Sequence, residues 1–75
     1  MTPTTSRPRT VTATAIEVLP SFGIAYLIDD HDMAWAVTKS TRGQGLQSLR
    51  PGQRVELTLD YDRDFSLVSA YRTLD

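Results

Sequence analysis

Two aromatic side chains of this sequence are spaced so that they could bind a flat ligand together. The stretch "GIAYLIDDHDMAWAV", Gly23 to Val37, has one apolar run before and one after four polar residues, which is typical of two strands joined by a hairpin turn. A turn at Asp30-His31 sets Tyr26 opposite Trp35. Because side chains two residues apart point the same way, the same face also carries Ile24, Ile28, Met33 and Val37.

The opposite face of this predicted hairpin carries smaller side chains. The interior of a small closed barrel has little room, so the sequence predicts that the face with the alanines points inward. The large side chains then form an exposed apolar patch, and such patches usually mark a binding surface. The alternative is the reverse assignment, in which the large residues form the core. The predicted inward residues are Ala25, Leu27, Ala34 and Ala36.

The segment that follows the hairpin is basic. Between Lys39 and Arg54 there are four positive charges and no acidic residue, although the net charge of the chain is −1. Unpaired bases stack on aromatic side chains, and cations neutralise the phosphates between the bases. The alternative is a solvated loop that happens to be basic. The predicted nucleic-acid-binding residues are Ile24, Tyr26, Trp35, Val37, Lys39, Arg42, Arg50 and Arg54, with Phe22 and Phe65 as secondary candidates.

Other kinds of chemistry have weak support. With no cysteine and one histidine, the chain has neither disulfides nor a thiolate or multi-histidine zinc site. The acidic residues around His31 are typical of a turn, and "DYDRD" from Asp60 lacks the glycine of a calcium loop. We find no nucleophile or phosphate-binding motif, and therefore expect no catalytic residue, no metal, no cofactor and no enzymatic activity.

The 75 residues suffice for one domain. We expect a flexible tail over residues 1–10 and a folded domain over 11–75, with no membrane segment and no secretory signal, hence a cytoplasmic protein. A tight turn is expected at Pro51-Gly52. Five strand-like segments predict a small all-β barrel: Thr10–Leu19, Phe22–Ile28, Met33–Thr38, Gln53–Tyr61 and Phe65–Leu74.

The segment "GLQSLRPGQRVELTL", Gly45 to Leu59, resembles the part of the cold-shock domain that leads into and forms its fourth strand. "GIAYLIDD" resembles the first RNA-binding motif of that family, and "AWAV" lies where the second motif is expected. The resemblance covers about residues 12–74. It implies a five-stranded antiparallel OB-type Greek-key barrel. The smallest bacterial translation initiation factor, also an OB barrel, shares a weaker similarity at Leu19-Pro20, Gly52 and Tyr61-Asp62.

By this resemblance, the outward aromatics of the first motif correspond to Ile24 and Tyr26. Trp35 then corresponds to the leading aromatic of the second motif and Val37 to its histidine. The sequence departs from the family pattern at several positions, because Ile24 and Val37 have no aromatic ring and Phe22 stands where a lysine is usual. Further departures are Thr38, in place of the last Phe of the second motif, and Glu17, near the place of a tryptophan.

Two functions therefore stay open. The first is a cold-shock-like protein that binds single-stranded RNA or DNA with low sequence specificity, by base stacking on the hairpin and by contacts from the basic loop. The second is a degenerate OB module that uses the same apolar face for a protein partner or a second copy of itself.

Overall fold

The structure of the protein is a computed structural model that describes residues 9–61 and 66–74. The predicted tail therefore lies mostly outside the described residues, as does Phe65, although the first strand already begins at Arg9. Each predicted strand is confirmed to within a few residues, and the all-β fold class is confirmed. The strands are β1 (Arg9–Leu19), β2 (Ile24–Asp29), β3 (Ala34–Thr38), β4 (Arg54–Tyr61) and β5 (Ser66–Thr73).

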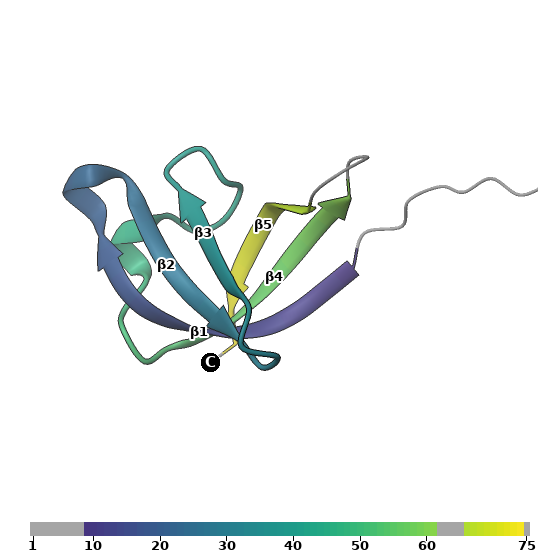
Figure 1. Cartoon of the computed structure of the whole chain (residues 1–75). Helices are drawn as coiled ribbons and strands as arrows, with labels where there is room; N and C mark the ends of the chain where they lie inside the picture. The colour runs from purple at the N-terminus through teal and green to yellow at the C-terminus, as the bar shows by residue number, and fades with distance from the viewer. Residues whose placement is uncertain (1–8, 62–65, 75) are drawn as a thin grey trace, which may run out of the picture.

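The five strands form one antiparallel sheet in the order β3-β2-β1-β4-β5, curled into an OB-like half-barrel (Figure 1). β1 lies in the middle and pairs with β2 along one half and with β4 along the other. β3 and β5 are the two ends of the sheet. Among the described residues, the sheet has one parallel bridge, between Arg42 and Ala70.

A bulge in β1 lets this strand serve both halves of the barrel. The pairing with β2 shifts between Ala15 and Glu17, so that Ile16 has no partner there and is exposed. An extra residue bends a strand and increases its twist. The inward positions accordingly change from Ala13 and Ala15 before the bulge to Val18 after it.

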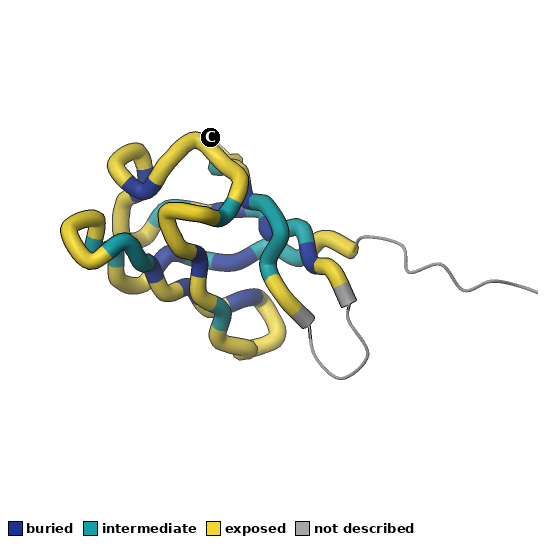
Figure 2. Tube along the Cα trace, turned by 90° about the horizontal axis from the view of Figure 1, so that it is seen from above, coloured by how far each residue is buried: buried dark blue, intermediate teal, exposed yellow. Residues whose placement is uncertain are grey.

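The core lies on the concave side of the sheet and is thin. Buried and exposed positions alternate along the strands (Figure 2), as expected when one face of each strand is covered. β1 contributes two buried alanines and β2 contributes Ala25 and Leu27, whereas β4 contributes three large side chains. Two residues of the loop before β4 complete the core, one of them in the short 3₁₀ helix Leu46–Ser48. The buried apolar residues are Ala13, Ala15, Ala25, Leu27, Val37, Leu46, Leu49, Val55, Leu57, Leu59 and Tyr71.

The predicted register of the β2–β3 hairpin is wrong by one residue. The turn has three residues instead of two, because Asp32 adopts a left-handed conformation with φ 65° and adds one position. The Asp29 amide donates to the Met33 carbonyl at 2.9 Å, and the Asp32 amide donates to the Asp29 carbonyl at 3.0 Å. This is the geometry of a three-residue hairpin loop closed by a left-handed residue. Tyr26 therefore pairs with Ala36.

This shift inverts the predicted faces of β3 and leaves those of β2 unchanged. Val37 is fully buried (0% exposed), and Trp35 is half-buried against the core. Ala34 and Ala36, which were predicted to point inward, are exposed. Small side chains still point into the narrow interior, but these inward alanines belong to β1 and β2 and not to β3.

The loop between β3 and β4 packs closely against β5. A Cβ on Gly43 would lie 2.5 Å from a ring carbon of Tyr71, so only glycine lets the chain pass at this distance. The predicted turn at Pro51-Gly52 is confirmed, with Gly52 at φ 87°. None of the described helices has the length and apolar character needed to cross a membrane.

Candidate functional site

The exposed side of the β2–β3 hairpin is the best candidate for a binding surface. We call it the outer face and define it by the outward residues of these two strands. At its centre, Tyr26 is 44% exposed, although it lies in the middle of a strand. Its partner in β3 is Ala36, whose methyl group is too short to cover the phenol ring. The outer face consists of Ile24, Tyr26 and Ile28 from β2 and Ala34, Ala36 and Thr38 from β3.

A second exposed ring and a cation lie at one end of this face. Phe22, 77% exposed, ends the short 3₁₀ helix Pro20–Phe22 just before β2. The helix is capped by Gly23 in a left-handed conformation (φ 71°). The Lys39 amide donates to the Gly23 carbonyl at 3.1 Å, and a Cβ on Gly23 would lie 3.3 Å from the Lys39 side chain. Lys39 therefore lies against Gly23, the residue that follows Phe22 at the start of β2.

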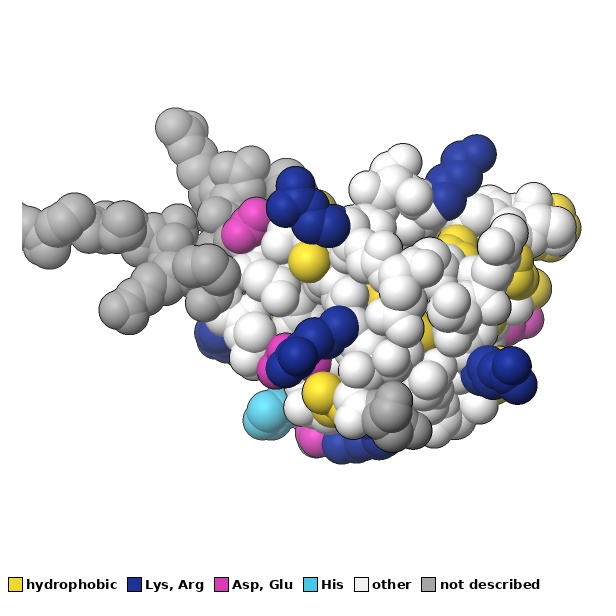
Figure 3. Space-filling model, turned by 180° about the vertical axis from the view of Figure 1, so that it is seen from behind, with side chains coloured by type: hydrophobic (Ala, Val, Ile, Leu, Met, Phe, Trp, Pro, Cys, Tyr) yellow, Lys and Arg dark blue, Asp and Glu magenta, His cyan; other side chains and the backbone are white. Residues whose placement is uncertain are grey.

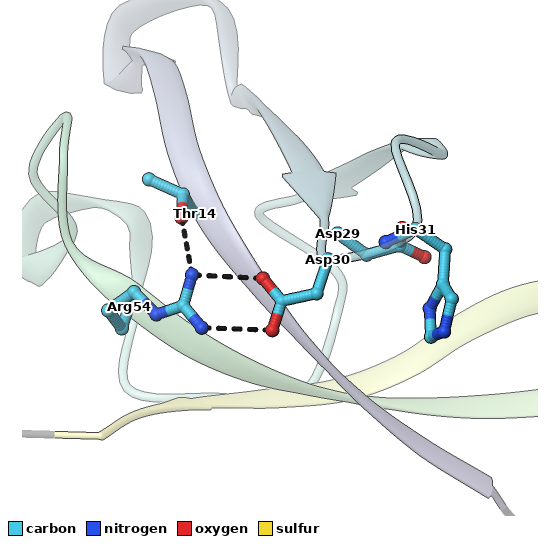
Figure 4. A network of polar contacts seen from close by, with 5 residues as sticks. All are labelled: Thr14, Asp29, Asp30, His31 and Arg54. Carbon is cyan, nitrogen blue, oxygen red and sulfur yellow. Dashed lines mark hydrogen bonds and ion pairs between the residues drawn. The ribbon is translucent and has the colours of Figure 1, made fainter.

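Arg54, a predicted phosphate contact, already forms an ion pair within the protein (Figure 4). Its two terminal nitrogens donate to the two carboxylate oxygens of Asp30, each at 3.0 Å, and one of them also donates to the Thr14 hydroxyl at 2.9 Å. The hydrogen bond from Arg54 lowers the pKa of Asp30, and Asp30 in turn raises the pKa of Arg54. A bidentate pair fixes the guanidinium, so a phosphate would have to compete with Asp30 for it.

The other predicted cations are exposed but do not form one basic patch. Arg42 lies beside β5 through its backbone bridge to Ala70, whereas Arg50 belongs to the turn before β4. On the side of the molecule seen in Figure 3, Lys and Arg side chains are spread out, and several have an acidic side chain next to them. The basic stretch of the sequence thus becomes separate cations around the barrel.

Asp29 positions the turn and the Trp35 indole, a role that was not predicted from the sequence. It is only 5% exposed, and its carboxylate accepts three hydrogen bonds: from the amides of His31 and Met33 at 2.8 and 2.9 Å, and from the Trp35 indole at 2.9 Å. The Trp35 hydrogen bond is the largest cause of a lowered Asp29 pKa. Asp29 therefore shapes the turn and holds the indole on the concave side.

One signal in the sequence could have revealed this role. Asp29 has the same parity in β2 as the inward Ala25 and Leu27, and a carboxylate at an inward position needs donors. The expectation that the acidic residues around His31 serve the turn is confirmed for Asp29 and Asp32, whereas the Asp30 carboxylate pairs with Arg54. No group of three or more His, Cys, Asp or Glu able to hold a metal ion occurs in the part of the chain that the structure describes.

Comparisons with protein-family models, with curated proteins and with solved structures found no match for this chain.

Proposed function

We propose that this protein is a non-catalytic, cytoplasmic module, similar to cold-shock domains, that binds single-stranded RNA or DNA with low sequence specificity on its outer face. The observation that supports this best is the exposed ring of Tyr26 at the centre of the hairpin, next to an alanine that leaves room for a flat base. The hairpin faces of OB-type barrels are a common surface for oligonucleotides.

The expected affinity is modest. Stacking of a base on an aromatic side chain contributes about 1–3 kcal/mol, largely regardless of sequence. Tyr26 supplies one such ring within the sheet and Phe22 a second one at its end. Trp35 and Val37, which the sequence placed on this face, point to the concave side and are not available for stacking there. The side chain of Lys39 lies against Gly23, between Phe22 and β2, so Lys39 is the expected phosphate contact.

A second candidate function is the docking of a protein partner or a second copy on the same face. The specific observation is the lack of positive charge, since neither β2 nor β3 contains a Lys or Arg. Glu17 lies directly opposite Tyr26 on β1, where its carboxylate would repel a phosphate. Two aliphatic side chains, Ile24 and Ile28, flank Tyr26 and suit an apolar partner equally well.

Fluorescence anisotropy of labelled oligo-dT and oligo-U tests the proposal. We expect saturable binding that weakens as salt is added. Tyr26→Ala should reduce the affinity by about 5- to 150-fold, which corresponds to the loss of one stacked base. Leu67→Ala is the matched control, because Leu67 is also exposed (53%) but lies on β5; its affinity should stay within about twofold of the original.

Two results would contradict the proposal. One is equal binding by the Tyr26→Ala protein and the unchanged chain, which would place the nucleic acid elsewhere. The other is no binding at high micromolar protein; if sedimentation then shows a dimer that Tyr26→Ala dissociates, the second candidate function replaces the first.

A further inference from the structure

The outer edge of β3 carries backbone groups without a strand partner. The hydrogen bond from the Asp29 amide to the Met33 carbonyl closes the hairpin. In an antiparallel pair, hydrogen-bonded and non-hydrogen-bonded positions alternate along the strand, so Ala34 and Ala36 are non-hydrogen-bonded positions. Their amides and carbonyls therefore point away from β2. β3 ends the sheet, and within the described ranges no other strand pairs with this edge.

This edge lacks several of the usual protections against strand addition, although β3 has only five residues and lies close to β5 in part. Sheet edges are commonly blocked by charged side chains, by proline or by a bulge. The segment Ala34–Thr38 contains no charge and no proline, and its pairing with β2 is regular. The edge stops at Thr38, whose amide donates to the Thr41 hydroxyl at 3.0 Å. The open part of the edge is thus short and centred on Ala34 and Ala36.

An apolar hollow adjoins the same segment on the concave side. Its volume is about 270 Å³, and two of the residues that line it, Met33 and Trp35, flank Ala34. Val11 of β1 and Leu59 of β4 also line it, together with three charged or polar residues. Among the residues that the structure describes, the lining is Arg9, Val11, Asp29, His31, Met33, Trp35 and Leu59.

We propose that an extended peptide from another protein binds here by adding a strand to β3 and placing a bulky apolar side chain in the hollow. The free backbone amides and carbonyls of Ala34 and Ala36 are spaced as in any strand, so the backbone of an extended peptide can pair with them. Side chains of an added strand alternate between the two faces of the sheet, so every second one would point to the concave side. Two independent features, the edge and the hollow, thus fit one ligand.

The size of the hollow favours a peptide side chain over a free small molecule. Sites for small ligands usually occupy about 300–1,000 Å³ and bury most of the ligand. The hollow is slightly smaller than that range and is open on one side. A second copy pairing through β3 would add only a strand of five residues on each side, which buries much less than the roughly 1,200 Å² of a stable interface.

The test is an NMR titration of the ¹⁵N-labelled protein with capped peptides in which threonine alternates with Leu, Phe or Ile. Peptides in which serine replaces the apolar residues are the control. We expect the apolar peptides to slow hydrogen exchange at the Ala34 and Ala36 amides and to shift the Trp35 indole signal, whereas the serine peptides do neither. If no apolar peptide has these effects at millimolar concentration, the proposal is wrong.

Ala36→Pro removes one free edge donor without removing a bond to β2, and should weaken peptide binding by about tenfold or more. Ala36→Ser keeps the amide and is the matched control. Should the proline variant fail to fold, a peptide N-methylated at its β3-facing amides tests the same bonds. The proposal is wrong if the methylated peptide binds as well as the unmethylated one. It is also wrong if, without peptide, protection of both amides rises with protein concentration, because the occupant of the edge is then a second copy.

This inference is independent of the proposed function. Tyr26→Ala should leave peptide binding unchanged, since the Tyr26 side chain lies on the outer face and β2 separates it from the free edge. Loss of oligonucleotide binding and loss of peptide binding are thus separate results.

Discussion

The register of the β2–β3 hairpin can be tested with two substitutions at neighbouring positions. Val37 is fully buried in the core, so Val37→Ala removes two methyl groups from a packed environment. At about 0.8 kcal/mol per buried methylene-sized group, and with a small cavity term added, the expected loss is about 2 kcal/mol of unfolding free energy. For a domain of this size, 1 kcal/mol corresponds to roughly 4–8 °C, so the melting temperature should fall by about 8–16 °C.

The matched substitution is Ala36→Val, which adds the same two methyl groups one position earlier. Ala36 is exposed in β3, so the change should alter the free energy of unfolding by less than about 0.5 kcal/mol. Urea denaturation followed by circular dichroism measures both variants. The opposite result would be a loss of about 1–3 kcal/mol for Ala36→Val, as overpacking causes, and no loss for Val37→Ala. That pair of results is expected for the register with the two-residue turn and would show that the three-residue register is wrong.

Two further predictions concern charged groups. The Trp35 hydrogen bond lowers the pKa of Asp29 in the folded protein. The ionised Asp29 therefore stabilises the fold above its unfolded pKa of about 3.9, and this stability is lost as the pH falls through its lower folded pKa. Asp29→Asn should remove this acid dependence and change the Trp35 emission at neutral pH; an unchanged pH profile of unfolding would argue against it. In oligonucleotide binding, Lys39→Ala should reduce the slope of log affinity against log salt by about one, whereas Arg54→Ala should leave that slope unchanged, since Arg54 is held by Asp30. An equal reduction of the slope in both variants would show that the ion pair opens on binding, and an unchanged slope for Lys39→Ala would show that Lys39 does not contact a phosphate.

The strands could be predicted from the sequence because each one is a short run of β-branched and apolar residues bounded by turn residues. The clean alternation of Val55, Leu57 and Leu59 in β4 gave the correct inward face, and all three residues are buried. The face of β2 was also predicted correctly. The bulge at Ile16 could not be predicted, since one unpaired residue in β1 leaves no mark on the composition of the strand.

The face of β3 was wrong because its assignment depended on the length of a turn. Four polar residues, Asp29 to Asp32, allow a turn of two or of three residues, and a change of one inverts every side chain of the following strand. The outcome was decided by the left-handed conformation of Asp32 and by the hydrogen bonds to Asp29. Trp35 and Val37 therefore do not lie on the predicted binding surface, whereas Tyr26 does.

If single-stranded nucleic acid binds on the outer face, as we propose, chemical-shift mapping will locate it there. A ¹⁵N-labelled sample is titrated with oligo-dT, and the shift of each backbone amide is followed. We expect the largest shifts at Tyr26, Ala36 and Lys39 and small ones at β5 residues such as Leu67. Saturating shifts confined to β4 and β5, or no shifts at millimolar oligonucleotide, would show that the outer face does not bind nucleic acid.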